Sequence, residues 1–151
     1  MELFSTACGK HVWFHQIERP FLLKPPFSGR RHVCIVFSCD ETVTEAEREA
    51  LTHLMFVSGC RFGVFTGHAC GAWEWALDTA CIASDPDYQP SEEPFTMTTS
   101  HEDETVEDVI FFGLMNTSYD AQDFDCFLIL LVGRCAGLRE EVESAIQSVM
   151  A

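Results

Sequence analysis

HVCIVFS, residues 32–38, is an uninterrupted apolar run rich in β-branched side chains. Strands that are buried on both faces have this composition, which is typical of parallel sheets covered by helices. A helix is predicted directly after the run. Thr42 and Glu45 fit a capping box, and apolar residues recur at helical spacing as far as Met55. Gly59 is well placed to end this helix, so the stretch predicts a strand followed by a helix.

Three further units of the same kind follow along the chain. RFGVFT (61–66) precedes a predicted helix over residues 70–83, in which Trp75 falls off the apolar stripe. A strand over 95–98 precedes a helix capped by Asp103 or Thr105. CFLILLV (126–132), the most apolar run in the chain, precedes a last helix that starts near residue 138. The four units predict an α/β fold: a single three-layer domain over residues 31–151, with a mainly parallel four- to five-stranded sheet and helices on both faces.

Residues 1–30 carry weaker signals. Pro20, Pro25 and Pro26 interrupt any regular element there. We therefore expect this segment to form an N-terminal arm or an edge strand of the domain.

The composition limits the classes of function. The chain has 151 residues, which suits one domain, and a formal net charge of -15. Such a surface should repel nucleic acid and anionic membranes, and it suits either solubility alone or a basic protein partner. No apolar stretch reaches the ~18 residues that a membrane span needs, and no signal peptide is visible at the start of the sequence.

The chain contains 8 cysteines but no CxxC pair, so neither a zinc ribbon nor a thioredoxin motif is indicated. Cys34, Cys81 and Cys126 lie in apolar segments, where cysteine behaves as a small hydrophobic residue. We expect reduced thiols and a cytoplasmic protein.

Ligands of parallel sheets bind beyond the carboxyl ends of the strands. Six polar residues are predicted to meet at that edge and form the candidate site: His101, Glu102, Asp103, Asp40, His68 and Arg134. Imidazole and carboxylate groups suit zinc or manganese, and a metal held by His68, His101 and Asp103, with Asp40 nearby, could activate water. The competing interpretation is that these residues only cap helices and form local hydrogen bonds. No cofactor is evident, although a divalent metal is possible.

Two weaker patterns lie at the same edge. Cys70 or Cys135 with a nearby histidine could form a nucleophile pair, against the simpler interpretation of incidental thiols. GRCAG (133–137) could bind an anion at a helix start, but it lacks the spacing of a phosphate-binding loop.

Two motifs resemble those of a known family. They are Ser58-Gly59-Cys60 followed by Gly67, Cys70 and Trp73, and the stretch MTTSHEDE (97–104). Together they are similar to an uncharacterised bacterial family, a domain of unknown function, over residues 30 to 132. The family often has an aromatic residue where this chain has Ser100, so a shared site beside His101 could differ here. The resemblance implies a bacterial, cytosolic origin and implies no activity.

Two functions follow as expectations. The first is an acidic intracellular binding protein with a basic partner, of the immunity or defence-accessory kind. The alternative is a metal-assisted hydrolase with its site around His101. Convergence of Asp40, His68, His101 and Asp103 in space would distinguish the two.

Overall fold

A computed structural model describes the whole chain except residues 6, 28, 86, 88–94 and 120–122. Most of the predicted loop over 84–94, and part of the loop over 116–125, therefore lie outside the described residues. The described strands are β1 (Glu2–Ser5), β2 (His11–Ile17), β3 (His32–Ser38), β4 (Cys60–Gly67), β5 (Met97–His101) and β6 (Cys126–Val132). The helices are α1 (Glu45–Val57), α2 (Cys70–Ala83), α3 (Val106–Met115) and α4 (Leu138–Val149), with a short 3-10 turn, η1, at Ala7–Gly9.

The strands form one sheet in the order β1-β2-β6-β3-β4-β5. Only β1 runs antiparallel to its neighbour, and the other strand pairs are parallel. Every residue of β3 and of β6 is buried, as their uninterrupted apolar sequences predict. The mainly parallel α/β fold is confirmed.

The sheet has six strands rather than four or five, because residues 1–30 contribute two of them. β1 lies at the edge, but β2 lies inside the sheet and pairs with β6 over its whole length. The sheet thus continues across the boundary that we expected at residue 30. HVWFHQI is not a continuous apolar run like those of β3 and β6, since Val12, Phe14 and Ile17 are buried among more exposed neighbours, so it did not indicate an interior strand.

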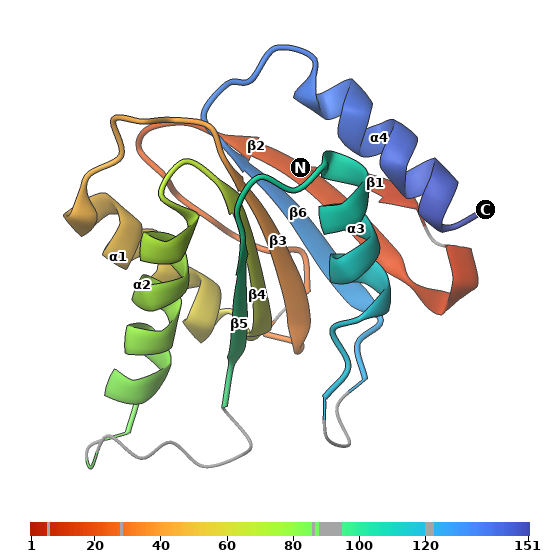
Figure 1. Ribbon diagram of the computed structural model, residues 1–151. Helices are drawn as coiled ribbons and strands as arrows, with labels where there is room; N and C mark the ends of the chain where they lie inside the picture. The colour runs from red at the N-terminus through yellow and green to blue at the C-terminus, as the bar shows by residue number, and fades with distance from the viewer. Residues whose placement is uncertain (6, 28, 86, 88–94, 120–122) are drawn as a thin grey trace.

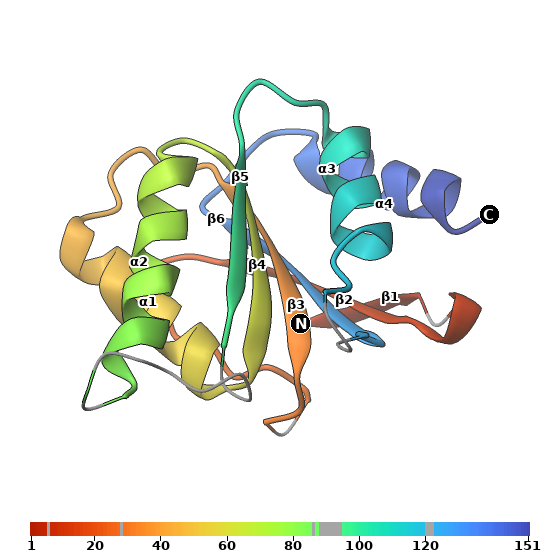
Figure 2. The same cartoon turned by 60° about the horizontal axis from the view of Figure 1, so that its bottom comes forward.

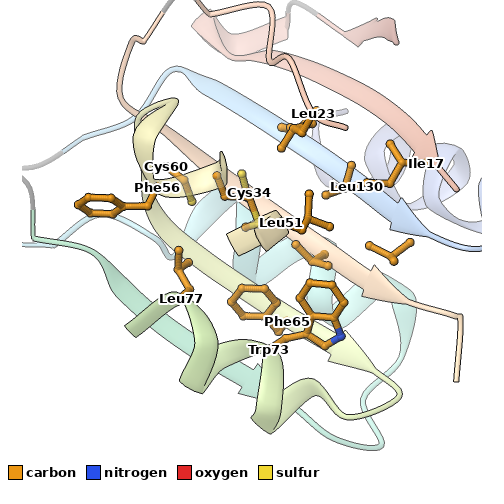
Figure 3. Close-up of a cluster of buried hydrophobic side chains, with 14 of the residues drawn as sticks. Ile17, Leu23, Cys34, Leu51, Phe56, Cys60, Phe65, Trp73, Leu77 and Leu130 are labelled. Carbon is orange, nitrogen blue, oxygen red and sulfur yellow. The ribbon is translucent and has the colours of Figure 1, made fainter. Parts of the chain in front are cut away.

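Helices cover both faces of the sheet, as Figure 1 and Figure 2 show: α1 and α2 lie on one face, and α3 and α4 on the other. The first face contains the larger core cluster, in which Leu51, Phe65, Trp73 and Leu77 pack together (Figure 3). Among the described residues, no helix combines the length and the apolar character needed to cross a membrane.

The structure moves one predicted helix start by two residues and decides another. The capping box of α1 is formed by Thr44 and Glu47 and not by Thr42 and Glu45. Thr42 instead belongs to a turn closed by Asp40, whose Oδ1 accepts hydrogen bonds from the Thr42 amide (2.8 Å) and hydroxyl (2.5 Å). The third helix is capped by Thr105, one of the two caps that the sequence allowed.

Candidate functional site

The carboxyl ends of five parallel strands lie at one edge of the sheet, at Ile17, Ser38, Gly67, His101 and Val132. The six candidate residues lie at these ends or directly beyond them. Glu18 and Arg19, which follow β2, belong to the same edge. These two residues were not predicted to lie at this edge, because the sequence did not indicate that β2 is an interior parallel strand.

His101 ends β5 and its side chain is buried. Its Nδ1 donates a hydrogen bond to Glu104 Oε2 at 2.6 Å, and its Nε2 lies 2.9 Å from Thr99 Oγ1. The ring packs against Phe112 with 4.7 Å between ring centroids. Because both ring nitrogens have partners inside the protein, the imidazole holds the end of β5 against the turn into α3.

The acidic turn after His101 lines an open depression. Its walls are Thr66, Gly67, Glu102, Asp103 and Glu104, and its volume is about 480 Å³. Asp103 has a left-handed backbone with φ of 56°, which aspartate tolerates better than most residues. It lies two residues before the helix cap at Thr105.

Asp40 is held by partners of its own. Beyond the Thr42 turn, its carboxylate lies 3.2 Å from Arg19, which also forms an ion pair with Glu47 at 2.7 Å. The hydrogen bonds from Thr42 and then the Arg19 charge hold the pKa of Asp40 below its usual range.

The other two candidates are exposed. Arg134 forms an ion pair with Glu18 at 2.8 Å, and this contact raises the pKa of its guanidinium. The backbone amide of His68 donates to Ser38 at 2.9 Å, while its side chain is exposed. The structure brings the candidates to one edge but gives Asp40, His101 and Arg134 separate partners.

A second candidate surface lies between α1 and α2. Glu45, Arg48, Glu49, Ala72, Trp75, Ala76 and Thr79 line a groove of about 180 Å³. The Trp75 side chain is 74% exposed, whereas Trp73, two residues earlier, is 1% exposed. The sequence indicated that Trp75 leaves the buried stripe, but only the packing of α1 beside α2 reveals the carboxylates around it.

The opposite face has a larger groove between α3 and α4, of about 560 Å³. It is also acidic, since Glu107, Glu140 and Glu141 line it, together with Thr105, Val106, Ser144, Ala145 and Ser148. No aromatic side chain is among these lining residues. Carboxylates line both grooves, but only the groove between α1 and α2 also contains an arginine, Arg48, and an exposed tryptophan, Trp75.

The amino edge of the sheet holds one group that the sequence analysis missed. His32, Cys34 and Cys60 are fully buried, and one ligand atom from each lies within 4.8 Å of the other two. A search of the described residues for histidine, cysteine and acidic side chains close enough to share a metal ion finds these three. His68, His101 and Asp103, the predicted metal ligands, do not form such a group. The His-x-Cys pattern at residues 32–34, which puts both side chains on one face of a strand, was the available signal.

A family model described as a domain of unknown function (DUF7684) matches residues 15–149. The match extends beyond residues 30 to 132, where the motifs suggested a resemblance, and includes the end of β2 and all of α4. No curated protein matches the chain, and neither does any solved structure. Because the match covers most of the sequence, the chain belongs to this family, the domain of unknown function DUF7684.

Proposed function

We propose that this domain is an acidic protein-binding module, and that it recognises a basic segment of its partner in the groove between α1 and α2. The observation that carries the proposal is Trp75, a large apolar side chain that is 74% exposed in a groove also lined by Glu45 and Glu49. The formal charge of -15 would speed the encounter with a basic partner at low salt.

Trp75 and the two glutamates offer complementary contacts to one lysine or arginine. The indole face attracts a cation through its quadrupole, and the alkyl part of a basic side chain covers its apolar surface. Glu45 and Glu49 are four residues apart on α1, so both side chains point toward the same side of the helix. Arg48, which lines the groove, already makes a related contact, because its guanidinium lies 5.9 Å from the centre of the ring of the buried Trp73.

This groove is favoured over the larger one between α3 and α4. Both are acidic, but aromatic residues are enriched where proteins bind one another, and carboxylates alone usually serve solubility. The setting that we propose is the bacterial cytoplasm, where masking a basic partner would suit an immunity or defence function. None of the eight cysteines, all of which are described, forms a disulfide, which is typical of a reducing compartment.

The alternative function, a metal-assisted hydrolase around His101, has less support. Its imidazole nitrogens are already engaged by Glu104 and Thr99. Asp40 is likewise engaged by Thr42 and Arg19, so neither side chain is left free to hold a metal at this edge.

The test is binding of a fluorescent peptide that alternates lysine or arginine with glycine, measured by polarisation at low salt. Trp75→Ala should weaken binding about tenfold, because a partly desolvated cation–π contact contributes ~1–2 kcal/mol. The double change Glu45→Gln and Glu49→Gln should weaken it about fivefold, from two exposed ion pairs of ~0.5 kcal/mol each.

The matched control is Glu140→Gln with Glu141→Gln, which removes the same charge from the other groove. It should leave the affinity within about twofold of wild type, since exposed charges that far apart are screened. Equal losses in the two double variants would mean that net charge alone attracts the peptide. That result, or an unchanged affinity in Trp75→Ala, would overturn the proposal.

A further inference from the structure

His32, Cys34 and Cys60 come together where two neighbouring strands begin. His32 is the first residue of β3 and is paired in register with Cys60, the first residue of β4. Cys34 lies two residues further along β3, on the same face as His32. Figure 3 shows the Cys34 and Cys60 side chains close together in the core below α1 and α2. This amino edge is opposite to the edge that carries His101.

The His32 ring is oriented as a metal ligand requires. Its Nδ1 lies 2.8 Å from the Arg30 carbonyl oxygen. A carbonyl can only accept, so Nδ1 carries the proton and Nε2 presents a lone pair. Ligating histidines are usually fixed in this way, by a hydrogen bond from the other nitrogen to a carbonyl or a carboxylate.

The Nε2 atom of His32 has no hydrogen-bond partner among the described residues, although the side chain is 0% exposed. An unsatisfied buried polar atom is costly, and native proteins contain few of them. One nitrogen of the His32 ring lies within 4.8 Å of both thiol sulfurs, and a metal ion held by the three side chains would satisfy the unpartnered Nε2.

We propose that His32, Cys34 and Cys60 bind a thiophilic divalent cation, and that Zn²⁺ is the ion that fits. Two thiolates and one imidazole are soft to borderline ligands, which select zinc or Cu⁺ over magnesium, calcium and manganese. Zinc takes nitrogen and sulfur ligands in a tetrahedral arrangement, and these side chains would supply three of its four positions.

Charge balance favours zinc over Cu⁺. In the structure both cysteines are free thiols. One Zn²⁺ would displace one proton from each thiol, so two protons leave and the buried group stays neutral. One Cu⁺ with the same two thiolates would leave a net negative charge in an apolar core, which is expensive.

The site would be structural, because it joins the first residues of two central strands at positions that solvent does not reach. It is also independent of the proposed binding groove, which Trp75 and α1 form on the helical surface. A change that abolishes zinc binding should therefore leave peptide binding unaffected, and a change that abolishes peptide binding should leave zinc binding unaffected.

The test uses the full chain without a histidine tag. Because the three side chains are fully buried, the protein is unfolded with denaturant and reductant and then refolded with either Zn²⁺ or a chelator. After gel filtration, metal analysis should find about one zinc per chain. Refolding with Co²⁺ should give the charge-transfer absorption of thiolate–cobalt bonds, and calorimetry in buffers of different ionisation enthalpy should show two protons released per zinc.

Cys34→Ala and Cys60→Ala should each abolish zinc retention and the cobalt absorption. Cys70→Ala is the matched control, because Cys70 is a buried thiol of the same core cluster, at the start of α2 and away from the triad. It should retain one zinc per chain. The cobalt and proton measurements use wild type, so they decide the matter even if a triad variant fails to fold.

Three results would overturn the proposal. The first is wild-type protein that retains no zinc and shows no cobalt–thiolate absorption after refolding. The second is undiminished zinc in the Cys34→Ala or Cys60→Ala protein. The third is a Cys34–Cys60 disulfide in protein isolated under native conditions without reductant, since a disulfide would consume both sulfur ligands. Retention of Cu⁺ in place of Zn²⁺ would refute the choice of ion.

Discussion

Replacing His101 with alanine distinguishes a structural role of this residue from a role in metal binding. The change removes two hydrogen bonds, to Glu104 and to Thr99, and the packing of the imidazole on Phe112. A typical internal hydrogen bond contributes about 1 kcal/mol, and an aromatic ring pair contributes about 1 kcal/mol beyond its buried area. The Glu104 side chain is 40% exposed, so water can replace the hydrogen bond that it loses. Leaving Glu104 without the imidazole therefore adds little to the cost in stability. The total is about 3 kcal/mol of unfolding free energy.

Urea unfolding of wild type and His101→Ala would measure this difference directly. For a chain of this size, about 3 kcal/mol also corresponds to a fall in Tm of roughly 6–12 °C. Thr105→Ala is a suitable comparison, because it removes only the cap of α3 and should cost about 1 kcal/mol. His101→Ala should therefore cost more than loss of the cap.

Melts with Mn²⁺ complete the test, because manganese prefers carboxylate and imidazole ligands and would not compete for the cysteines of the triad. We expect no manganese-dependent change in Tm in either protein. An unfolding free energy of His101→Ala within 0.5 kcal/mol of wild type would refute the hydrogen-bond reasoning. A rise in Tm with Mn²⁺ that His101→Ala abolishes would restore the carboxyl-edge metal site and, with it, the hydrolase.

Two further predictions concern the buried histidine and the thiols. Burial, assisted by the Arg61 charge, lowers the pKa of His32 from 6.5 to about 4, so between these pH values the unfolded chain binds a proton that the native protein does not. Stability of the metal-free protein should therefore be complete above pH 6.5 and fall by about 3 kcal/mol as the pH drops to 4. His32→Gln should lack this part of the decline in urea titrations, and equal pH slopes in both proteins would contradict the reasoning. Alkylation of native protein without reductant, followed by mass spectrometry, should modify the exposed Cys8 and Cys135 rapidly, and the buried cysteines only after unfolding. Detection of bridged pairs would show that the thiols are not reduced.

Local sequence patterns were sufficient for the elements with strong periodicity. The runs at 32–38 and 126–132 predicted strands buried on both faces, and the bounds of both agree with β3 and β6. The predicted helix over 70–83 coincides with α2, and its pattern also placed Trp75 outside the core. In these segments, burial on two faces or on one helical stripe leaves a signal in the residues themselves.

Weaker signals were misassigned where nearby side chains compete for the same backbone. Thr42 and Glu45 fit a capping box as well as Thr44 and Glu47 do, but Asp40 holds Thr42 in a turn, so the helix starts later. Similarly, β5 begins at Met97 instead of residue 95, since its bounds depend on pairing with β4. β2 was missed because its partner, β6, is more than a hundred residues away in sequence.

The sequence by itself determined the fold class, the acidic surface and the edge at which His101 and Asp40 lie, because parallel strands bring their carboxyl ends together whatever their order. Only the tertiary structure decided what those residues do, since the partners of His101 and Asp40 depend on side-chain directions that no spacing encodes. It also decided that Cys60 meets His32 and Cys34. Cys60 lies on a different strand from His32 and Cys34, and the pairing of β3 with β4 brings the three side chains together.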